Sequence, residues 1–171
     1  MSLSVERSMS VLVLGVGNLL LKDEGVGVRV VEELERRYAI PDGVEVLDGG
    51  TAGMELLSVM ANRDCVILVD AVKTGDEPGT VVRLADEEVP AFFRTKISPH
   101  QVGLSDVLAT LTITGEKPGS VVVIGIVPKD LGTGLEISTE IEAKIDEMIE
   151  LVAGELDRRG IPLKPRDASL H

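Results

Sequence analysis

The stretch Val11–Gly27, VLVLGVGNLLLKDEGVG, sets how the rest of the chain can fold. Its first six residues are apolar on both faces of an extended chain, which is typical of a buried strand in a parallel sheet. A turn then delivers Asp23 and Glu24 to a helix that is predicted over about Gly25–Tyr38. Two carboxylates between a buried strand and a helix are unusual for stability alone, so we interpret this turn as part of a functional site.

Strand and helix patterns alternate along the remaining chain. We expect further strands at Val44–Leu47, Val66–Val69, Thr80–Leu84 and Ser120–Val127, and further helices at Met54–Ala61, Leu104–Leu111 and Ser138–Arg159. The polar segment KTGDEPG is too short for a crossover helix, so Thr80–Leu84 is expected to run antiparallel to its neighbour. Ala85–Pro99 is expected to be irregular. The pattern predicts an α/β fold, a three-layer α/β/α sandwich with a mixed, mostly parallel five-stranded twisted sheet.

The composition is that of one globular domain with an aliphatic core. Of 171 residues, 44% are hydrophobic and only 2% aromatic, so Val, Leu and Ile must form the core. We expect a single domain over residues 1–171, with its core at about 10–160 and flexible termini. Cys65 is the one cysteine and is expected to be buried, which excludes an intrachain disulfide and a multi-thiolate zinc site.

Charge and hydropathy exclude several classes of partner. The net charge of −12 argues against a nucleic-acid partner, which requires a basic face. No apolar run approaches the roughly 18 residues that a membrane span requires. The opening MSLSVERS lacks the apolar core of a signal peptide. We therefore expect a cytoplasmic protein with no nucleic acid and no membrane among its partners.

Acidic residues follow three of the predicted strands, and one histidine lies in the segment SPHQVG. Ligands of open α/β sheets bind outside the carboxyl ends of the strands, where Glu24, Asp48 and Asp70 are expected. A buried, unpaired Asp70 in VILVDAV would be costly, which favours a partner or a metal. With His100, in what we expect to be a loop, Glu24 and Asp70 form a nitrogen and two-carboxylate set that suits zinc, nickel, manganese or iron alike.

Each of these residues also has a structural interpretation. Asp48 could cap the GGTAG loop that follows it, and Glu24 gains from the dipole of the following helix in any case. A single histidine is more often structural than a ligand. The two phenylalanines, Phe92 and Phe93, are either a small satellite core or a hydrophobic landing surface for a protein substrate.

Other catalytic motifs are incomplete. The run that begins at Gly15 resembles a dinucleotide fingerprint, but Leu20 replaces its third glycine. No phosphate-binding loop with Gly-Lys-Ser/Thr is present, and no Gly-x-Ser-x-Gly elbow of a serine hydrolase.

Taken together, these features resemble the hydrogenase maturation endopeptidases. The resemblance covers nearly the whole chain and is carried by LGVGNLLLKDEGVGVRVVE, LDGGTAGMELL, VDAV, DEEVPAFFRTKISPHQVGLSDVL and VIGIVPK. It implies a cytoplasmic protease that removes the C-terminal extension from the large-subunit precursor of a nickel–iron hydrogenase after nickel insertion. A non-catalytic chaperone that senses nickel in the same large subunit is the alternative of a different class.

The resemblance also implies roles for individual residues. Metal binding falls on Glu24, Asp70 and His100, with nickel carried by the substrate and other divalent metals able to occupy the site in vitro. Asp48 falls on an acid implicated in activity and is our candidate for a general base, so the predicted catalytic residues are Asp48, Glu24 and Asp70. We expect the protein to act as a monomer.

Overall fold

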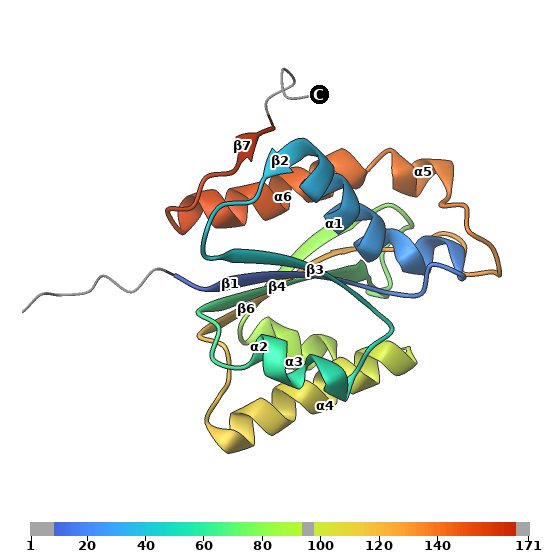
Figure 1. Ribbon diagram of the computed structural model, residues 1–171. Coiled ribbons are helices and arrows are strands. Elements are labelled where there is room, and N and C mark those ends of the chain that lie inside the picture. Colours follow the sequence, from blue (N-terminus) through green and yellow to red (C-terminus); the bar gives the residue numbers. More distant parts are fainter. Residues whose placement is uncertain (1–8, 94–97, 167–171) are drawn as a thin grey trace, which may run out of the picture.

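The computed structural model describes residues 9–93 and 98–166 of the chain. Its sheet has the strand order β3-β1-β4-β6-β5. The strands are β1 (Val11–Val16), β3 (Val44–Gly50), β4 (Cys65–Ala71), β5 (Val81–Ala85) and β6 (Ser120–Ile126). All neighbours are parallel except β5 and β6, which are antiparallel. The mixed five-stranded sheet and its antiparallel edge strand are thus confirmed (Figure 1).

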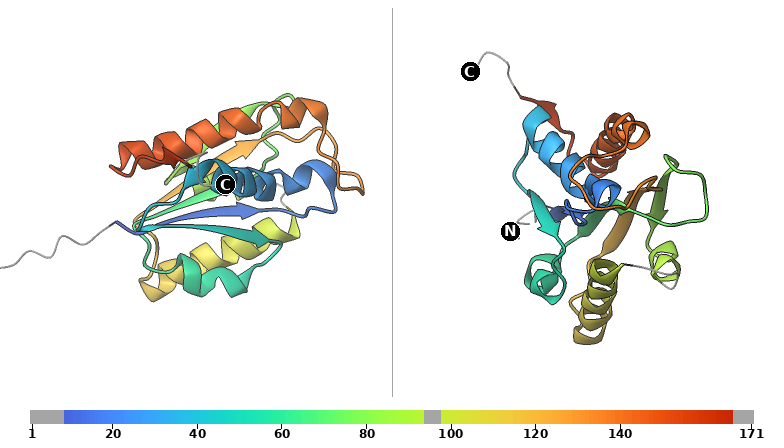
Figure 2. Two further views of the ribbon diagram at one scale, coloured as in Figure 1. Left: turned by 45° about the horizontal axis from the view of Figure 1, so that its top comes forward. Right: turned by 90° about the vertical axis from the view of Figure 1, so that its right-hand side faces the viewer.

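Helices cover both faces of the sheet and give three layers (Figures 1 and 2). One face carries α1 (Val26–Arg37) and α6 (Ile145–Arg158), and the other carries α2 (Leu57–Met60), α3 (Glu88–Phe92) and α4 (Pro99–Thr114). Val13 belongs to the core under α1 and α6, whereas its neighbour Leu12 belongs to the core on the opposite face. Strands that are buried on both faces explain the continuous apolar runs in the sequence.

Short elements complete the fold. They are η1 (Lys22–Gly25), β2 (Tyr38–Ala39), η2 (Met54–Leu56), α5 (Thr139–Glu142) and β7 (Lys164–Pro165). β2 and β7 form a separate two-stranded antiparallel sheet. None of the described helices has the length and apolar character to cross a bilayer. The flexible ends that the sequence predicted fall largely on residues outside those described.

Several predicted boundaries were wrong. Tyr38 is extended rather than helical because it pairs with Pro165 in the small sheet. The predicted last helix is two helices, α5 and α6, separated by Ala143 and Lys144. The segment Ala85–Pro99 is not wholly irregular, since α3 lies within it.

The predicted burial of Cys65 is confirmed, and Phe93 is half-buried against the core under α2 and α4. This contact fits the satellite-core interpretation of Phe93. The side chain of Phe92 lies outside the described part of the structure.

Two glycines allow the turn after β1 to approach the sheet closely. A Cβ on Gly27 would lie 2.1 Å from the carbonyl oxygen of Val69, and one on Gly17 would lie 1.8 Å from the carbonyl oxygen of Glu24. Gly17 also has φ of 132°, which other residues rarely adopt. The two glycines therefore allow the backbone segments to pack closely, and this packing brings Glu24 to the end of β4.

Candidate active site

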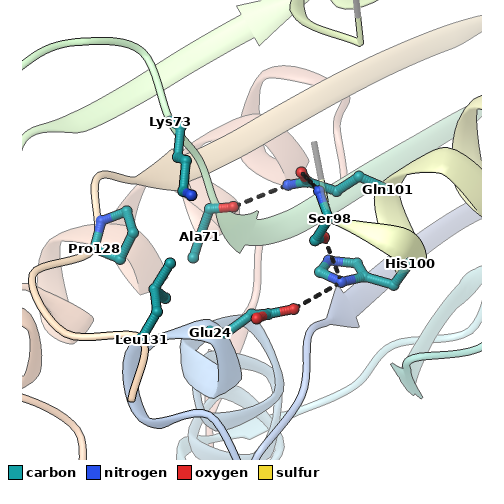
Figure 3. Close-up of a pocket in the computed structure, with 8 residues that line it drawn as sticks. All are labelled: Glu24, Ala71, Lys73, Ser98, His100, Gln101, Pro128 and Leu131. Carbon is teal, nitrogen blue, oxygen red and sulfur yellow. Dashed lines mark hydrogen bonds and ion pairs between the residues drawn. The ribbon is translucent and has the colours of Figure 1, made fainter. Parts of the chain in front are cut away.

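The carboxyl-terminal edge of the sheet holds a cavity of about 310 Å³. Residues from four segments line it: Glu24, Ala71, Lys73, Ser98, His100, Gln101, Pro128 and Leu131 (Figure 3). Glu24 lies in η1 after β1, and His100 is the second residue of α4. Asp70 lies behind this lining, one residue before the end of β4. Segments far apart in the sequence thus meet at the edge where ligands of such sheets bind.

The imidazole of His100 lies between two carboxylates. Its Nδ1 is 3.0 Å from Oε1 of Glu24, and its Nε2 is 2.9 Å from Oδ2 of Asp70. The hydroxyl of Ser98 is 2.8 Å from the same Nδ1. His100 and Asp70 are almost fully buried, at 5% and 3% exposure. The structure therefore brings together the three residues that the sequence selected.

His100 is placed by the start of a helix, where we expected a loop. Ser98 caps α4, its backbone N–H donates to Oε1 of Gln101 at 3.2 Å, and Pro99 occupies the first helical position. Pro is favoured at this position, and Ser with Gln three residues later forms a capping box. The helix therefore begins five residues earlier than predicted, although the sequence Ser-Pro-His-Gln carries the signal for its start.

Gln101 is a site residue that the sequence prediction did not include. Its Nε2 donates to Oδ2 of Asp70 at 2.8 Å and to the carbonyl oxygen of Ala71 at 3.0 Å. Oδ2 of Asp70 consequently accepts hydrogen bonds from both Gln101 and His100, which fixes the orientation of the carboxylate. The capping-box pattern identifies Gln101 as a helix residue but gives no sign of its contact with Asp70.

Asp23 lies in the turn that the sequence indicated as part of a site, but its structural role there was not predicted. It is fully buried and accepts hydrogen bonds from the backbone N–H groups of Lys129, Asp130 and Ser138, at 2.7 to 2.9 Å, and from the Ser138 hydroxyl at 2.8 Å. Burial alone would raise its pKa, but these hydrogen bonds hold the pKa of Asp23 below its usual range. Asp23 thereby fixes the loop that carries Pro128 and Leu131 to the cavity.

Asp48 stands apart from the other predicted residues. It lies within β3 rather than after it, is exposed, and its Oδ1 accepts a hydrogen bond from the Gly50 N–H at 2.8 Å. This local bond is the capping interaction that the sequence analysis gave as the structural alternative for Asp48. Asp48 is not among the residues that line the cavity. Its catalytic role stays a prediction.

The electrostatics of the cluster favour protonated forms. Burial raises the pKa of the Asp70 carboxyl, and hydrogen bonds from His100 and Gln101 reduce this effect without reversing it. Burial alone would lower the pKa of His100, but the hydrogen bond and charge of Asp70, with those of Glu24, raise it overall. The cluster therefore retains a proton to a higher pH than isolated side chains would, and can act in acid–base chemistry.

The donor types fit a transition metal, whereas the present arrangement is a hydrogen-bonded chain. One imidazole and two carboxylates suit nickel, zinc, manganese or iron. However, each ring nitrogen faces a different carboxylate, and the described part of the chain holds no group of three His, Cys, Asp or Glu side chains arranged around a metal. Metal binding by Glu24, Asp70 and His100 remains a prediction.

Comparison with known proteins identifies the family. A family model described as hydrogenase maturation protease matches residues 28–155. The chain belongs to the hydrogenase maturation proteases. It is 53% identical over 161 residues to the hydrogenase 2 maturation protease of Escherichia coli (strain K12), covering 94% of this chain and 98% of that one.

More distant relatives agree with this assignment. The hydrogenase expression/formation protein HupM of Azotobacter chroococcum mcd 1 is 41% identical over 162 residues, which are 94% of this chain and 78% of that one.

Solved structures of the family share the fold. The hydrogenase maturating endopeptidase HybD from E. coli superimposes with a TM-score of 0.90 at 53% identity, over 92% of this chain and 98% of that one. The [NiFe] hydrogenase maturation protease HybD from Thermococcus kodakarensis matches with a TM-score of 0.71 at 29% identity, over 86% and 99% of the two chains. The resemblance, the fold class and the expectation of a peptide-bond hydrolase in hydrogenase maturation are confirmed.

Proposed function

We propose that this protease removes the C-terminal extension of the large-subunit precursor of a nickel–iron hydrogenase, as a cytoplasmic monomer, once nickel has been inserted. The observation that carries the proposal is the contact of His100 with both Glu24 and Asp70 beside a cavity at the sheet edge. A proton-holding cluster next to an open cavity is what hydrolysis of a peptide bond needs, because water must lose a proton and the leaving amine must gain one.

The buried and exposed members of the cluster would have different tasks. Asp70, almost fully buried, orients His100 through Nε2, as the acid of a catalytic triad orients its histidine. Glu24 lines the cavity with a side chain that is 13% exposed, so it can contact a bound peptide directly. Gln101 and Asp23 then serve as positioning residues for Asp70 and for the cavity wall.

Nickel enters this proposal as part of the substrate. The nickel of a loaded precursor would contact Glu24, Asp70 and His100, which offer the ligand types that nickel accepts. Bound there, the ion would polarise the scissile carbonyl or activate a water molecule. Other divalent metals would occupy the same donors in vitro. Because each ring nitrogen now faces a carboxylate, an ion that meets all three residues would replace at least one of these contacts.

The test compares nickel-loaded with nickel-free precursor at substoichiometric amounts of protease, following the mass of the precursor. We expect loss of a C-terminal peptide from the loaded form alone, abolished by Glu24→Gln and by His100→Ala. Exposed Glu142 on α5 provides the matched control, because Glu142→Gln removes a carboxylate away from the cavity. Tight binding without mass loss would instead show the nickel-sensing chaperone, and cleavage of both forms would exclude nickel recognition.

Asp48 is our proposed general base, and Glu24 is the alternative. In support of Asp48, its carboxylate is exposed near the end of β3, and among the described residues only its Oδ1 has a hydrogen-bond partner. In support of Glu24, this side chain lines the cavity. We expect Asp48→Asn to lower kcat by at least about a hundredfold, the size typical of a lost general base. Full activity of Asp48→Asn would assign the role to Glu24.

A further inference from the structure

Large apolar side chains are exposed mainly at the edge of the sheet that holds the cavity. Six such side chains are exposed in the part of the chain that the structure describes, and four of them lie in segments at this edge: Leu20 at 62%, Met54 at 48%, Val102 at 46% and Leu135 at 61%. The other two, Met9 before β1 and Ile113 near the end of α4, lie at the opposite edge (Figure 1).

The four residues form two pairs. Leu20 and Leu135 are joined through the backbone, since the N–H of Gly134 donates to the carbonyl oxygen of Leu20 at 2.8 Å. Met54 and Val102 are neighbours of Gly53 and Gly103, whose backbones touch: a Cβ on Gly103 would lie 2.9 Å from Cα of Gly53. That approach requires a glycine at position 103, whereas a Cβ on Gly53 would lie 3.4 Å from Cα of Gly103.

The cavity lies between segments that carry these pairs. Leu20 lies four residues before Glu24, Leu135 follows Leu131 in one loop, and Val102 is two residues after His100. Leu20 and Leu135 precede η1 and α5, whereas Met54 begins η2 and Val102 lies in α4, and α2 and α4 cover the face of the sheet opposite α1 and α6 (Figures 1 and 2). Three of the four apolar positions, Leu20, Val102 and Leu135, thus belong to segments that also contribute residues to the cavity lining.

Apolar side chains scattered singly over a surface need no explanation, but pairs that flank a catalytic cavity do. A protease for short peptides needs contacts only within its cavity. A protease that acts on one folded protein gains selectivity when surfaces beside the scissile segment also dock. The cores of protein–protein interfaces are depleted of charged residues. Although the chain carries a net charge of −12, these four exposed positions hold apolar side chains.

We infer that Leu20, Met54, Val102 and Leu135 form a docking rim for an apolar surface on the folded body of the large-subunit precursor, while the C-terminal segment of the precursor enters the cavity. The inference rests on the proposed function. The precursor is the occupant because Leu20, Val102 and Leu135 belong to segments that also line the cleavage cavity, and Met54 lies next to the Gly53–Gly103 contact with one of them.

The experiment measures binding and turnover of the nickel-loaded precursor by two paired variants, Leu20→Ser/Leu135→Ser and Met54→Ser/Val102→Ser. Each is expected to raise KM about tenfold, which corresponds to about 1.4 kcal/mol of binding, while kcat stays within twofold of the parent. Ile113→Ser, at the most exposed of these apolar positions, is the matched control and should change neither value. Thermal unfolding of each variant shows that it is folded.

Two other outcomes would contradict the proposed docking rim. Unchanged KM in both folded pairs would exclude it as a docking surface for the precursor. A parent protein that sediments as a dimer and becomes monomeric in the paired variants would assign the surface to a second copy of the chain. Measuring the affinity of the parent and of each paired variant for the precursor directly, without following cleavage, separates the two proposals, because loss of binding in the rim variants would support docking even if the parent protein cleaved nothing.

Discussion

Asp23 and Glu24 are adjacent in the sequence but lie in different environments. Asp23 is fully buried under the loop that follows β6, whereas Glu24 reaches the cavity and lies 3.0 Å from Nδ1 of His100. The first carboxylate fixes the wall of the cavity and the second lines the cavity itself. One turn after β1 thus supplies both a support of the cavity wall and a carboxylate of the candidate site.

The neutral variant Asp23→Asn should destabilise the protein. An amide oxygen replaces a carboxylate that accepts four hydrogen bonds, and the amide nitrogen would face N–H donors. We expect the free energy of unfolding to fall by about 2–4 kcal/mol, measured by urea denaturation, since each charge-assisted bond contributes about 1.5–3 kcal/mol.

Asp130→Asn is the control for this change. Asp130 lies in the same loop and pairs with Lys22 at 2.9 Å, but the two side chains are 46% and 32% exposed. Exposed pairs of this kind contribute less than about 1 kcal/mol. Equal losses of unfolding free energy in the two variants would mean that the buried Asp23 carboxylate stabilises the protein no more than the exposed Asp130 carboxylate does.

Gln101→Met should impair catalysis more than stability. The substitution keeps the length of the side chain but removes the donor that holds Oδ2 of Asp70 and the carbonyl oxygen of Ala71, together with the Oε1 atom that accepts from the Ser98 N–H. Loss of such a positioning group typically costs about 10–100-fold, and we expect this loss in kcat with little change in KM. Thr110→Ala, on the exposed face of the same helix, should leave both values unchanged. A rise in KM alone would assign Gln101 to substrate binding.

The free energy of unfolding should depend on pH through protonation of Glu155. This side chain is 2% exposed and contacts Arg83 and Arg158. Burial alone would raise its pKa, but the hydrogen bonds and charges of the two arginines hold the pKa below the ordinary value of 4.5. The unfolded chain therefore takes up this proton at a higher pH than the folded one. Its contribution to stability is present above about pH 4.5 and is lost as the pH falls further.

The variant Glu155→Gln checks this assignment through unfolding measured between pH 7 and pH 2. It should be less stable than the parent at pH 7 by about 1–2 kcal/mol, because the buried side chain loses its charge-assisted hydrogen bonds to Arg83 and Arg158, whose own side chains are partly exposed. The difference should shrink towards the acidic end. Parallel pH profiles would show that other carboxylates dominate acid unfolding.

Cys65 should be unreactive in the folded protein. It is fully buried at the start of β4, and burial raises the pKa of its thiol to about 11. Because the thiolate is the nucleophile, iodoacetamide at pH 8 should modify the native protein at least about a hundredfold more slowly than the protein in urea. Rapid modification under native conditions would indicate frequent local opening of β4.

The sequence by itself determined the strands of the sheet and the chemical types in the site. Runs such as VILVD are apolar on both faces, and only a sheet covered on both sides accommodates them. The short KTGDEPG connection favoured an antiparallel strand over a parallel one, and β5 is indeed antiparallel to β6. Glu24, Asp70 and His100 could be selected because strand ends and a single central histidine are visible without knowledge of contacts.

Only the tertiary structure decided which of these groups touch. His100 reaches both carboxylates because α4 begins at Pro99, and Asp48 stays outside the cavity because β3 is an edge strand that continues past it to Gly50. The roles of Gln101 and Asp23 depend on contacts across 30 and more than 100 residues of sequence. Periodicity reports burial of single positions, whereas such contacts depend on strand order and on the packing of helices against the sheet, which no local pattern encodes.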